Sequence, residues 1–374
     1  MTDFNRMLED GYVSARKHPT LPLVIYNYTE KTTFARYWNP ITNLCRGLIV
    51  SDTGEIIARP FAKFHNINTD WMPETTIEQL PASDPLITKK MDGSLGIFWD
   101  YRGVWGIATR GSFTSEQADW ATDKLASMFG VGRGMWWPDG YTPLFEIIYG
   151  ANRIVVDYDF DNLVLIGMVN NDTGREMNYY SVCGWGSLNN VRVVEQLNEK
   201  LSYALNQNIP NEEGYVATWD MGELPTVKVK IKFADYVAMH RVVTGWNPKT
   251  VWEMISTGKG NYLAELVANP KYPLNFRQWL SGWEAKLTNR HAELKAQAQR
   301  MYSVARWALG TLDHTSSEYQ SKRKQYAAFF FKTCSNNGLR GILFAMLDDR
   351  DYNTELWKLV KPRGDDKSFI VEGQ

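Results

Sequence analysis

The pattern of the sequence changes at about residue 243, and this change constrains the fold more than any other feature. Before it, short runs of β-branched and aromatic residues alternate with Gly, Asp, Asn and Pro, which is typical of short strands joined by turns. After it, apolar residues recur at steps of three, four or seven from Phe276 to Ala308, as on one face of a long helix. We therefore expect an α+β domain over residues 1–243 and an all-helical domain over residues 244–374.

Charge and cysteine content exclude several classes of protein. The net charge is −1, so the chain carries no overall basic signal for nucleic acid, although Lys271 to Arg340 hold twelve Lys and Arg against four Asp and Glu. The three cysteines form no CxxC pair, which excludes a disulfide framework and a cysteine zinc site and favours a reducing compartment. No run of about twenty apolar residues is present, so we expect no membrane span and a cytoplasmic location.

The stretch ITKKMDGSLGIF (87–98) raises the first question about chemistry. Strand-like runs flank Asp92-Gly93, and Asp-Gly is a strong hairpin signal. Lys90 then stands where a strand enters a turn. It is either a solvated lysine of a hairpin or the nucleophile of a Lys-x-Asp-Gly motif, and the second interpretation requires a lowered pKa.

A nucleophilic lysine would need further cations and a carboxylate close to it. Five basic residues lie in strand-like runs and are candidates: Arg46, Lys63, Arg110, Lys230 and Lys232. In VKVKIKF (227–233) lysines alternate with apolar residues, which places Lys228, Lys230 and Lys232 on one face of a strand. That face is either an exposed sheet surface or a site for a polyanion.

Several ordered segments resemble one family. KMDGS (90–94), LFEII (144–148), EGYVA (213–217) and KIK (230–232) occur in the order found in covalent nucleotidyltransferases, which include DNA ligases, RNA ligases and capping enzymes. CRGLIV (45–50), RPFAKFHN (59–66) and NRIVVDY (152–158) are similar to segments of the bacteriophage RNA ligase 1 family. The resemblance implies a nucleotidyltransferase domain of antiparallel sheets flanked by helices.

The resemblance also implies an activity. Lys90 would attack the α-phosphate of ATP to form lysyl-AMP, with Mg²⁺ as cofactor. The AMP would pass to the 5′-phosphate of an RNA end, and an RNA 3′-hydroxyl would then seal the strand. Lys90, Lys230 and Lys232 are the implied catalytic residues, and the field of the last two would help to lower the pKa of Lys90.

The same resemblance assigns the nucleotide contacts. Arg46 and Lys63 would contact the triphosphate, and Glu213 would hold Mg²⁺, although Glu212 beside it is an alternative. Glu146 would bind the ribose hydroxyls, or else form a salt bridge to Arg153. The other implied ATP-binding residues are Ile87, Thr88 and Lys89 at the adenine, Asp92 and Gly93 of the motif, Arg110, and Gly214, which would permit a close backbone approach.

Two positions depart from the family pattern. ATRGS (108–112) stands where a relative has Lys-Ser-Lys-Gly-Ser, so Ala108 lacks a charge and Arg110 replaces a lysine, which is not an equivalent phosphate ligand. His65 replaces a second Phe after Lys63. It is either a packed aromatic substitute or a source of pH-dependent charge.

The basic helical part is the candidate for holding RNA. In the family this region is linked to preference for tRNA broken in its anticodon loop, and a separate kinase/phosphatase prepares the RNA ends. The resemblance thus implies nicked tRNA as partner and the cytoplasm of a phage-infected bacterium as location. Two alternatives remain: a DNA ligase of the same superfamily, and a catalytically inactive nucleic-acid-binding homologue.

Overall fold

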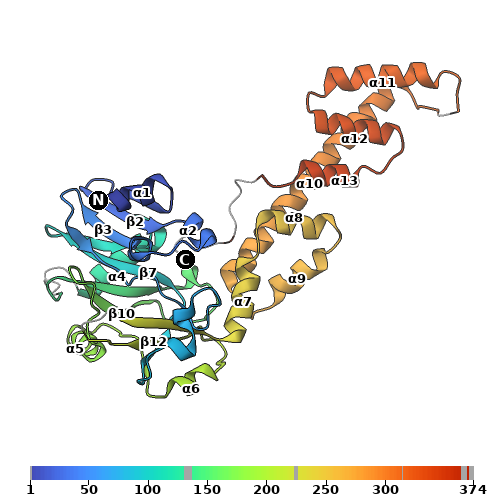
Figure 1. The fold of residues 1–374 in the computed structure, drawn as a ribbon. Coiled ribbons are helices and arrows are strands. Elements are labelled where there is room, and N and C mark those ends of the chain that lie inside the picture. The colour runs from blue at the N-terminus through green and yellow to red at the C-terminus, as the bar shows by residue number, and fades with distance from the viewer. Residues whose placement is uncertain (1, 130–136, 223–225, 314, 364–368, 370–374) are drawn as a thin grey trace. The chain divides into compact units, whose positions relative to one another are not determined.

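A computed structural model describes residues 2–129, 137–222, 226–313, 315–363 and 369 (Figure 1). It divides into two compact units, one running up to Val242 and one covering Val243–Phe369. Residues 370–374, the end of the expected helical domain, lie outside the described residues. No helix among the described residues is long and apolar enough to cross a membrane.

The first unit is built on three sheets in the described part of the chain. Sheet A has the order β1-β2-β3-β4 and contains β1 (Val13–Lys17), β2 (Leu23–Tyr28), β3 (Arg46–Ser51) and β4 (Ile56–Ala58). Sheet B has the order β11-β6-β12-β13-β5 and contains β5 (His65–Asn66), β6 (Leu86–Lys90), β11 (Gln196–Leu197), β12 (Gly214–Trp219) and β13 (Val227–Lys232). Sheet C has the order β10-β9-β7-β8 and contains β7 (Ser94–Tyr101), β8 (Val104–Ala108), β9 (Tyr141–Ile148) and β10 (Asn162–Asn170). The pairings are antiparallel except that of β13 with β5, so the expected α+β class with antiparallel sheets is confirmed.

Helices and 3-10 turns complete the first unit. They are α1 (Thr2–Glu9), α2 (Glu30–Ala35), α3 (Pro40–Leu44), η1 (Pro73–Thr75), η2 (Ile77–Gln79), α4 (Glu116–Phe129), η3 (Gly150–Asn152), α5 (Tyr179–Asn189), α6 (Leu201–Leu205) and α7 (Ala234–Thr244), which runs across the division between the units. The segment VRVVEQLNEKLSYAL (191–205) has the composition of a single helix, but only Leu201–Leu205 is helical and the chain forms β11 before it. Its Gln196 and Leu197 pair with Thr88 and Ile87 at the edge of sheet B, so tertiary pairing overrides local helix propensity there.

The hairpin expected around Asp92-Gly93 is also wrong. β6 pairs with β11 and β12, whereas β7 pairs with β8 and β9. The Asp-Gly turn therefore carries the chain from sheet B to sheet C. A Cβ added to Gly93 would lie 2.5 Å from the carbonyl oxygen of Ile147, so the chain passes β9 at a distance that only glycine permits.

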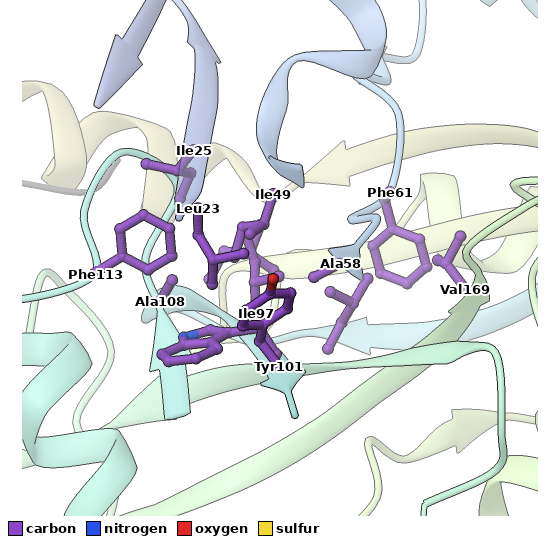
Figure 2. Close-up of a cluster of buried hydrophobic side chains, with 13 residues drawn as sticks. Leu23, Ile25, Ile49, Ala58, Phe61, Ile97, Tyr101, Ala108, Phe113 and Val169 are labelled. Atoms are coloured by element: carbon purple, nitrogen blue, oxygen red, sulfur yellow. The ribbon is translucent and has the colours of Figure 1, made fainter. Parts of the chain in front are cut away.

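The alternation of apolar residues explains how sheets A and C pack. Leu23 and Ile25 of β2 are each 1% exposed, and they lie in one core with Ile97 of β7 and Ala108 of β8 (Figure 2). In sheet B the buried face is formed by alternate residues, such as Val229 and Ile231 of β13. The lysines of β13 alternate with them and are therefore directed to the other face.

The second unit is helical. It contains α8 (Pro248–Ser256), α9 (Gly260–Ala268), α10 (Leu274–Leu309), α11 (Tyr319–Thr333), α12 (Asn337–Leu347) and α13 (Asn353–Leu359). Helices α8 and α9 pack on the first half of α10, and α11 and α12 lie along its second half (Figure 1). The apolar face predicted for α10 is the buried one, with Phe276, Leu280, Leu287 and Leu294 each at most 4% exposed.

Candidate functional site

A cavity of about 620 Å³ lies in the first unit, within the volume range of small-molecule sites. Its walls come from the lysine face of sheet B, from sheet C, and from residues of sheet A and the segment after it. Twelve of the predicted site residues line it: Arg46, Lys63, Thr88, Lys89, Lys90, Asp92, Gly93, Arg110, Glu146, Glu213, Lys230 and Lys232. Side chains from distant parts of the sequence are thus brought to one cavity.

Two of the predicted residues do not line the cavity. Ile87 is fully buried on the opposite face of β6, in the core behind sheet B. Gly214 lies between Lys90 on β6 and Lys232 on β13 in the strand register. Its φ is +142°, and an added Cβ would lie 1.9 Å from the carbonyl oxygen of Ile231. The close backbone approach that we expected at Gly214 is therefore an approach of β12 to the neighbouring strand β13.

The centre of the site is a carboxylate held by two lysines. Glu213 is 3% exposed, with Oε2 2.7 Å from Lys90 Nζ and Oε1 2.8 Å from Lys232 Nζ. The register that places Gly214 between the two strands also places Glu213 at their ends, so one carboxylate reaches both ammonium groups. The pKa of Glu213 is lowered, because the attraction of Lys90 and Lys232 outweighs the burial that would raise it.

Lys89 and Glu212, which precede Lys90 and Glu213 in the sequence, form ion pairs of their own. Lys89 Nζ lies 3.1 Å from Glu195 and 3.2 Å from Glu212. Since successive side chains of a strand point to opposite faces, Lys89 and Lys90 take different carboxylate partners. The structure thereby distinguishes Glu212 from Glu213, which sequence alone left ambiguous.

The prediction that the pKa of Lys90 is lowered is wrong for the protein without a bound nucleotide. Burial would lower the pKa, but Glu213 and Glu146 raise it above its ordinary value. The lowered value belongs to Lys230 instead, because burial and the charges of Arg46 and Lys90 bring its pKa well below the usual range. The cations expected near Lys90 are present, but the carboxylates closest to it dominate.

A cluster of cations surrounds Tyr28 at one end of the cavity. The Tyr28 hydroxyl accepts a hydrogen bond from Arg110 Nη1 at 2.8 Å and one from Lys63 Nζ at 3.5 Å. Arg46 Nη1 is buried and has no hydrogen-bond partner among the described residues. Burying an unsatisfied guanidinium nitrogen is costly. An anion such as a phosphate would satisfy it.

The residues that depart from the family pattern lie in different environments. Ala108 is fully buried in the core shown in Figure 2, where a charged side chain would not be solvated, whereas Arg110 reaches the cavity.

His65 forms edge-on ring contacts with Trp38 at 5.4 Å and Trp71 at 5.2 Å. Burial and the nearby lysines lower its pKa to about 4, so His65 is a packed, neutral aromatic group near neutral pH.

The motif aspartate is fixed by a buried network. Asp92 is 4% exposed. Its Oδ2 accepts hydrogen bonds from the backbone N–H groups of Val155 and Val156 at 2.9 and 2.8 Å, and its Oδ1 accepts one from the Tyr236 hydroxyl at 2.7 Å. The Asp92 backbone N–H donates to the Tyr158 hydroxyl at 2.8 Å. This network sets the path of the chain directly after Lys90.

Glu146 faces the same turn. One of its oxygens accepts the Gly93 N–H at 3.0 Å, and burial raises the pKa of this carboxyl to about 7. Arg153, considered as its salt-bridge partner, forms an ion pair with Asp157 at 2.9 Å. Glu146 lines the cavity and can accept hydrogen bonds from a polar ligand there.

Sequence reasoning missed three tyrosines that form hydrogen bonds in the site: Tyr28, Tyr158 and Tyr236. Tyr236 lies in α7, only four residues after Lys232 at the end of β13, and this closeness in sequence could have suggested it. Tyr28 gives no such signal, because LPLVIYNY resembles any half-buried strand and only tertiary structure brings Arg46, Lys63 and Arg110 to it.

The site does not form a closed metal cage. No group of three or more His, Cys, Asp or Glu side chains converges within the residues described. Mg²⁺ is usually bound by one or two carboxylates together with substrate phosphates and water. Glu213 fits such a shared site, but not a resident cation held by protein alone.

Comparison with known proteins gives a family. Residues 44–234, just over half of the 374-residue chain, match the RNA ligase family of the phage T4 RNA ligase 1 type. A protein of Thermovibrio ammonificans named "Putative RNA ligase" is 27% identical over 239 residues, covering 61% of this chain and 60% of that protein. The RNA ligase of Rhodothermus phage RM378 is 22% identical over 282 residues, covering 58% of this chain and 64% of that protein.

Among solved structures, an archaeal ATP-dependent RNA ligase aligns over 88% of this chain and 76% of its own, with 14% identity and a TM-score of 0.45. Of the two sequence relatives, the chain spans less than two thirds of the length in each case. The family match covers β3 through the start of α7, including the segments that supply Lys90, Glu213 and the lysines of β13. The chain therefore belongs to the RNA ligase family of the phage RNA ligase 1 type.

Proposed function

We propose that the protein is an ATP-dependent RNA ligase that joins 5′-phosphate and 3′-hydroxyl ends through lysyl-AMP and RNA-adenylate intermediates. The observation that carries the proposal is the Lys90–Glu213–Lys232 arrangement at a nucleotide-sized cavity whose other end holds the cations around Tyr28. Phosphoryl transfer depends mainly on positioning and on charge stabilisation, and this cavity offers both.

In the first step Lys90 forms a P–N bond to the α-phosphate of ATP, and the P–O bond to pyrophosphate breaks. Arg46, Lys63 and Arg110 are assigned to the triphosphate. The unsatisfied Nη1 of Arg46 supports this assignment. Lys230 and Lys232, on the same face of β13, are assigned to the α-phosphate, and Thr88, Lys89 and the backbone beside them to the adenine.

Lys90 must lose its proton before it attacks. Glu213 now raises its pKa, so the proposal requires the charge of this carboxylate to be neutralised when the nucleotide binds. Glu213 would be a ligand of Mg²⁺, and the charge of the bound ion would supply that neutralisation. Asp92 and Gly93 hold the turn, and Glu146 is assigned to the ribose hydroxyls.

The proposal also covers the RNA substrate and the part of the chain that binds it. We assign the helical residues 244–374 to RNA binding because Lys271 to Arg340 carry an excess of eight positive charges. Nicked tRNA, end preparation by a separate kinase/phosphatase and a role during phage infection are inferred from the family resemblance.

A sealing assay tests this function against the alternatives. The substrates are a stem-loop RNA with one break in its loop, bearing 5′-phosphate and 3′-hydroxyl ends, and a DNA of the same sequence. We expect ATP-dependent sealing of the RNA. Sealing of the DNA alone would identify a DNA ligase, and failure with both, together with no lysyl-AMP, would identify an inactive homologue.

A further inference from the structure

The second unit exposes an apolar strip at the C-terminal end of α10. Trp307 is 88% exposed and Val304 is 53% exposed. Arg300, also exposed, stands four residues before Val304 and seven before Trp307, so the three side chains share one face of the helix. We call these three residues the Trp307 strip. A tryptophan that is almost fully exposed at the end of a packed helix contributes little to the core and is available to a partner.

Four cations of α10 and α11 have no acidic partner in the described part of the chain. Among the described residues, no acidic side chain lies within ion-pair distance of Arg300, Arg306, Lys322 or Lys324. Some other basic residues of the unit do have acidic partners, such as Arg290 with Glu293 at 3.0 Å. Arg300 belongs to the strip and Arg306 directly precedes Trp307, so positive charge is available on the helix that carries the strip.

Helix α11 brings one of these cations, Lys322, to the end of α10. The Tyr326 hydroxyl donates to the carbonyl oxygen of Gly310 at 2.5 Å, and the Lys322 side chain lies against Gly310. α11 contains four Lys and Arg and no Asp or Glu. Its N-terminal half thus places positive charge close to the residues that follow Trp307.

We propose that the Trp307 strip binds RNA with unpaired bases, with one base stacked on the indole and Arg300, Arg306 and Lys322 contacting phosphates. Every base has a flat face that can stack on an aromatic ring, and cations follow the backbone without reading sequence. A second copy of the chain is disfavoured as occupant, because a symmetric contact would bring the same unpaired cations together. This inference rests on the proposed function and adds to it the RNA feature recognised.

Binding to two RNAs tests the proposal. One probe is a 5′-phosphorylated stem-loop broken in its loop, and the other is a fully paired duplex of equal length. Trp307→Ala in the full chain is expected to weaken binding of the broken loop by about five- to one-hundred-fold, the usual range for loss of one stacked base. Binding of the duplex is expected to change less than about twofold, because phosphate contacts remain.

Matched variants separate stacking from other effects. Trp307→Phe keeps an aromatic face and is expected to stay within about threefold of wild type on the broken loop. Arg300→Gln is expected to weaken both RNAs and to reduce the dependence of affinity on salt. Leu188→Ala removes a side chain that is 86% exposed in the first unit and is expected to leave both affinities unchanged.

The contradictory outcomes are distinct from a failure of the proposed function. Equal affinity of wild type and Trp307→Ala for the broken loop, in protein that forms lysyl-AMP and seals RNA, would overturn the inference alone. So would a change of oligomeric state in Trp307→Ala with RNA binding intact, because the strip would then be a contact between copies. Absence of lysyl-AMP in the wild type would instead count against the proposed function.

Discussion

Lys90 Nζ lies 2.7 Å from Oε2 of Glu213, so the candidate nucleophile of the free protein is held as an ammonium ion by the carboxylate proposed to bind Mg²⁺. The two roles are therefore linked: whatever neutralises Glu213 also lowers the pKa of Lys90.

The first prediction concerns the pH dependence of lysine adenylylation. Because the pKa of Lys90 in the free protein is raised, only a small neutral fraction exists near pH 7, and that fraction grows about tenfold per pH unit. The value of kcat/KM reports ionisations of the free enzyme and should rise steadily from pH 7 to 9. A profile that is flat across this range would show that Lys90 is already neutral.

The second prediction concerns Tyr28. Tyr28→Phe removes the hydroxyl that accepts from Arg110 and Lys63. The two cations lose their common anchor, and loss of such a charge-assisted hydrogen bond corresponds to roughly a tenfold rise in KM for ATP. Tyr26→Phe on the same strand, where Tyr26 packs on Phe4, is the control and should leave KM unchanged. An unaltered KM in both variants would remove Tyr28 from the site.

The third prediction concerns stability and Glu146. Burial raises the pKa of this carboxyl to about 7, above its value in an unfolded chain. Its stabilising contribution is thus fully present below about pH 4.5 and is lost as pH rises towards 7. Glu146→Gln keeps an acceptor for the Gly93 N–H and removes the titration. Its free energy of unfolding relative to wild type should rise by about 1–3 kcal/mol between pH 5 and pH 8. Denaturant unfolding at both pH values checks this, and parallel changes in the two proteins would contradict it.

The fourth prediction concerns His65. Its pKa of about 4 is below that of an unfolded histidine, so it stabilises the fold above about pH 6.5 and this contribution is lost as pH falls towards 4. His65→Phe should keep adenylylation within about threefold of wild type at pH 7.5, because the ring contacts with Trp38 and Trp71 are retained. It should also unfold less readily than wild type at pH 5. Loss of adenylylation in His65→Phe, with the fold intact, would indicate that the imidazole has a chemical role.

The sequence predicted much of the site because its elements are local. The alternation in VKVKIKF fixes which face of β13 carries Lys228, Lys230 and Lys232, and the cavity lies on that face. The period of α10 likewise predicted its buried side. These are properties of short segments, in which the geometry of one strand or helix decides the direction of each side chain.

Other features depended on which segments meet. Asp92-Gly93 has the composition of a hairpin, but this turn connects two sheets. It packs closely against β9, and Asp92 accepts hydrogen bonds from the backbone of Val155 and Val156. The pKa of Lys90 was predicted with the wrong sign, because Glu213 comes to it from 123 residues away. Pairing of distant residues sets such electrostatic relations, and no local pattern reports them.

The central claim is that Lys90 is the residue that accepts AMP. We would incubate the protein with ATP labelled at its α-phosphate and Mg²⁺, denature it, and measure label and intact mass for wild type, Lys90→Ala and Lys89→Ala. The account predicts label and the added mass of one AMP on wild type and on Lys89→Ala, and neither on Lys90→Ala. Label that persists on Lys90→Ala, or wild type with neither label nor added mass, would contradict it.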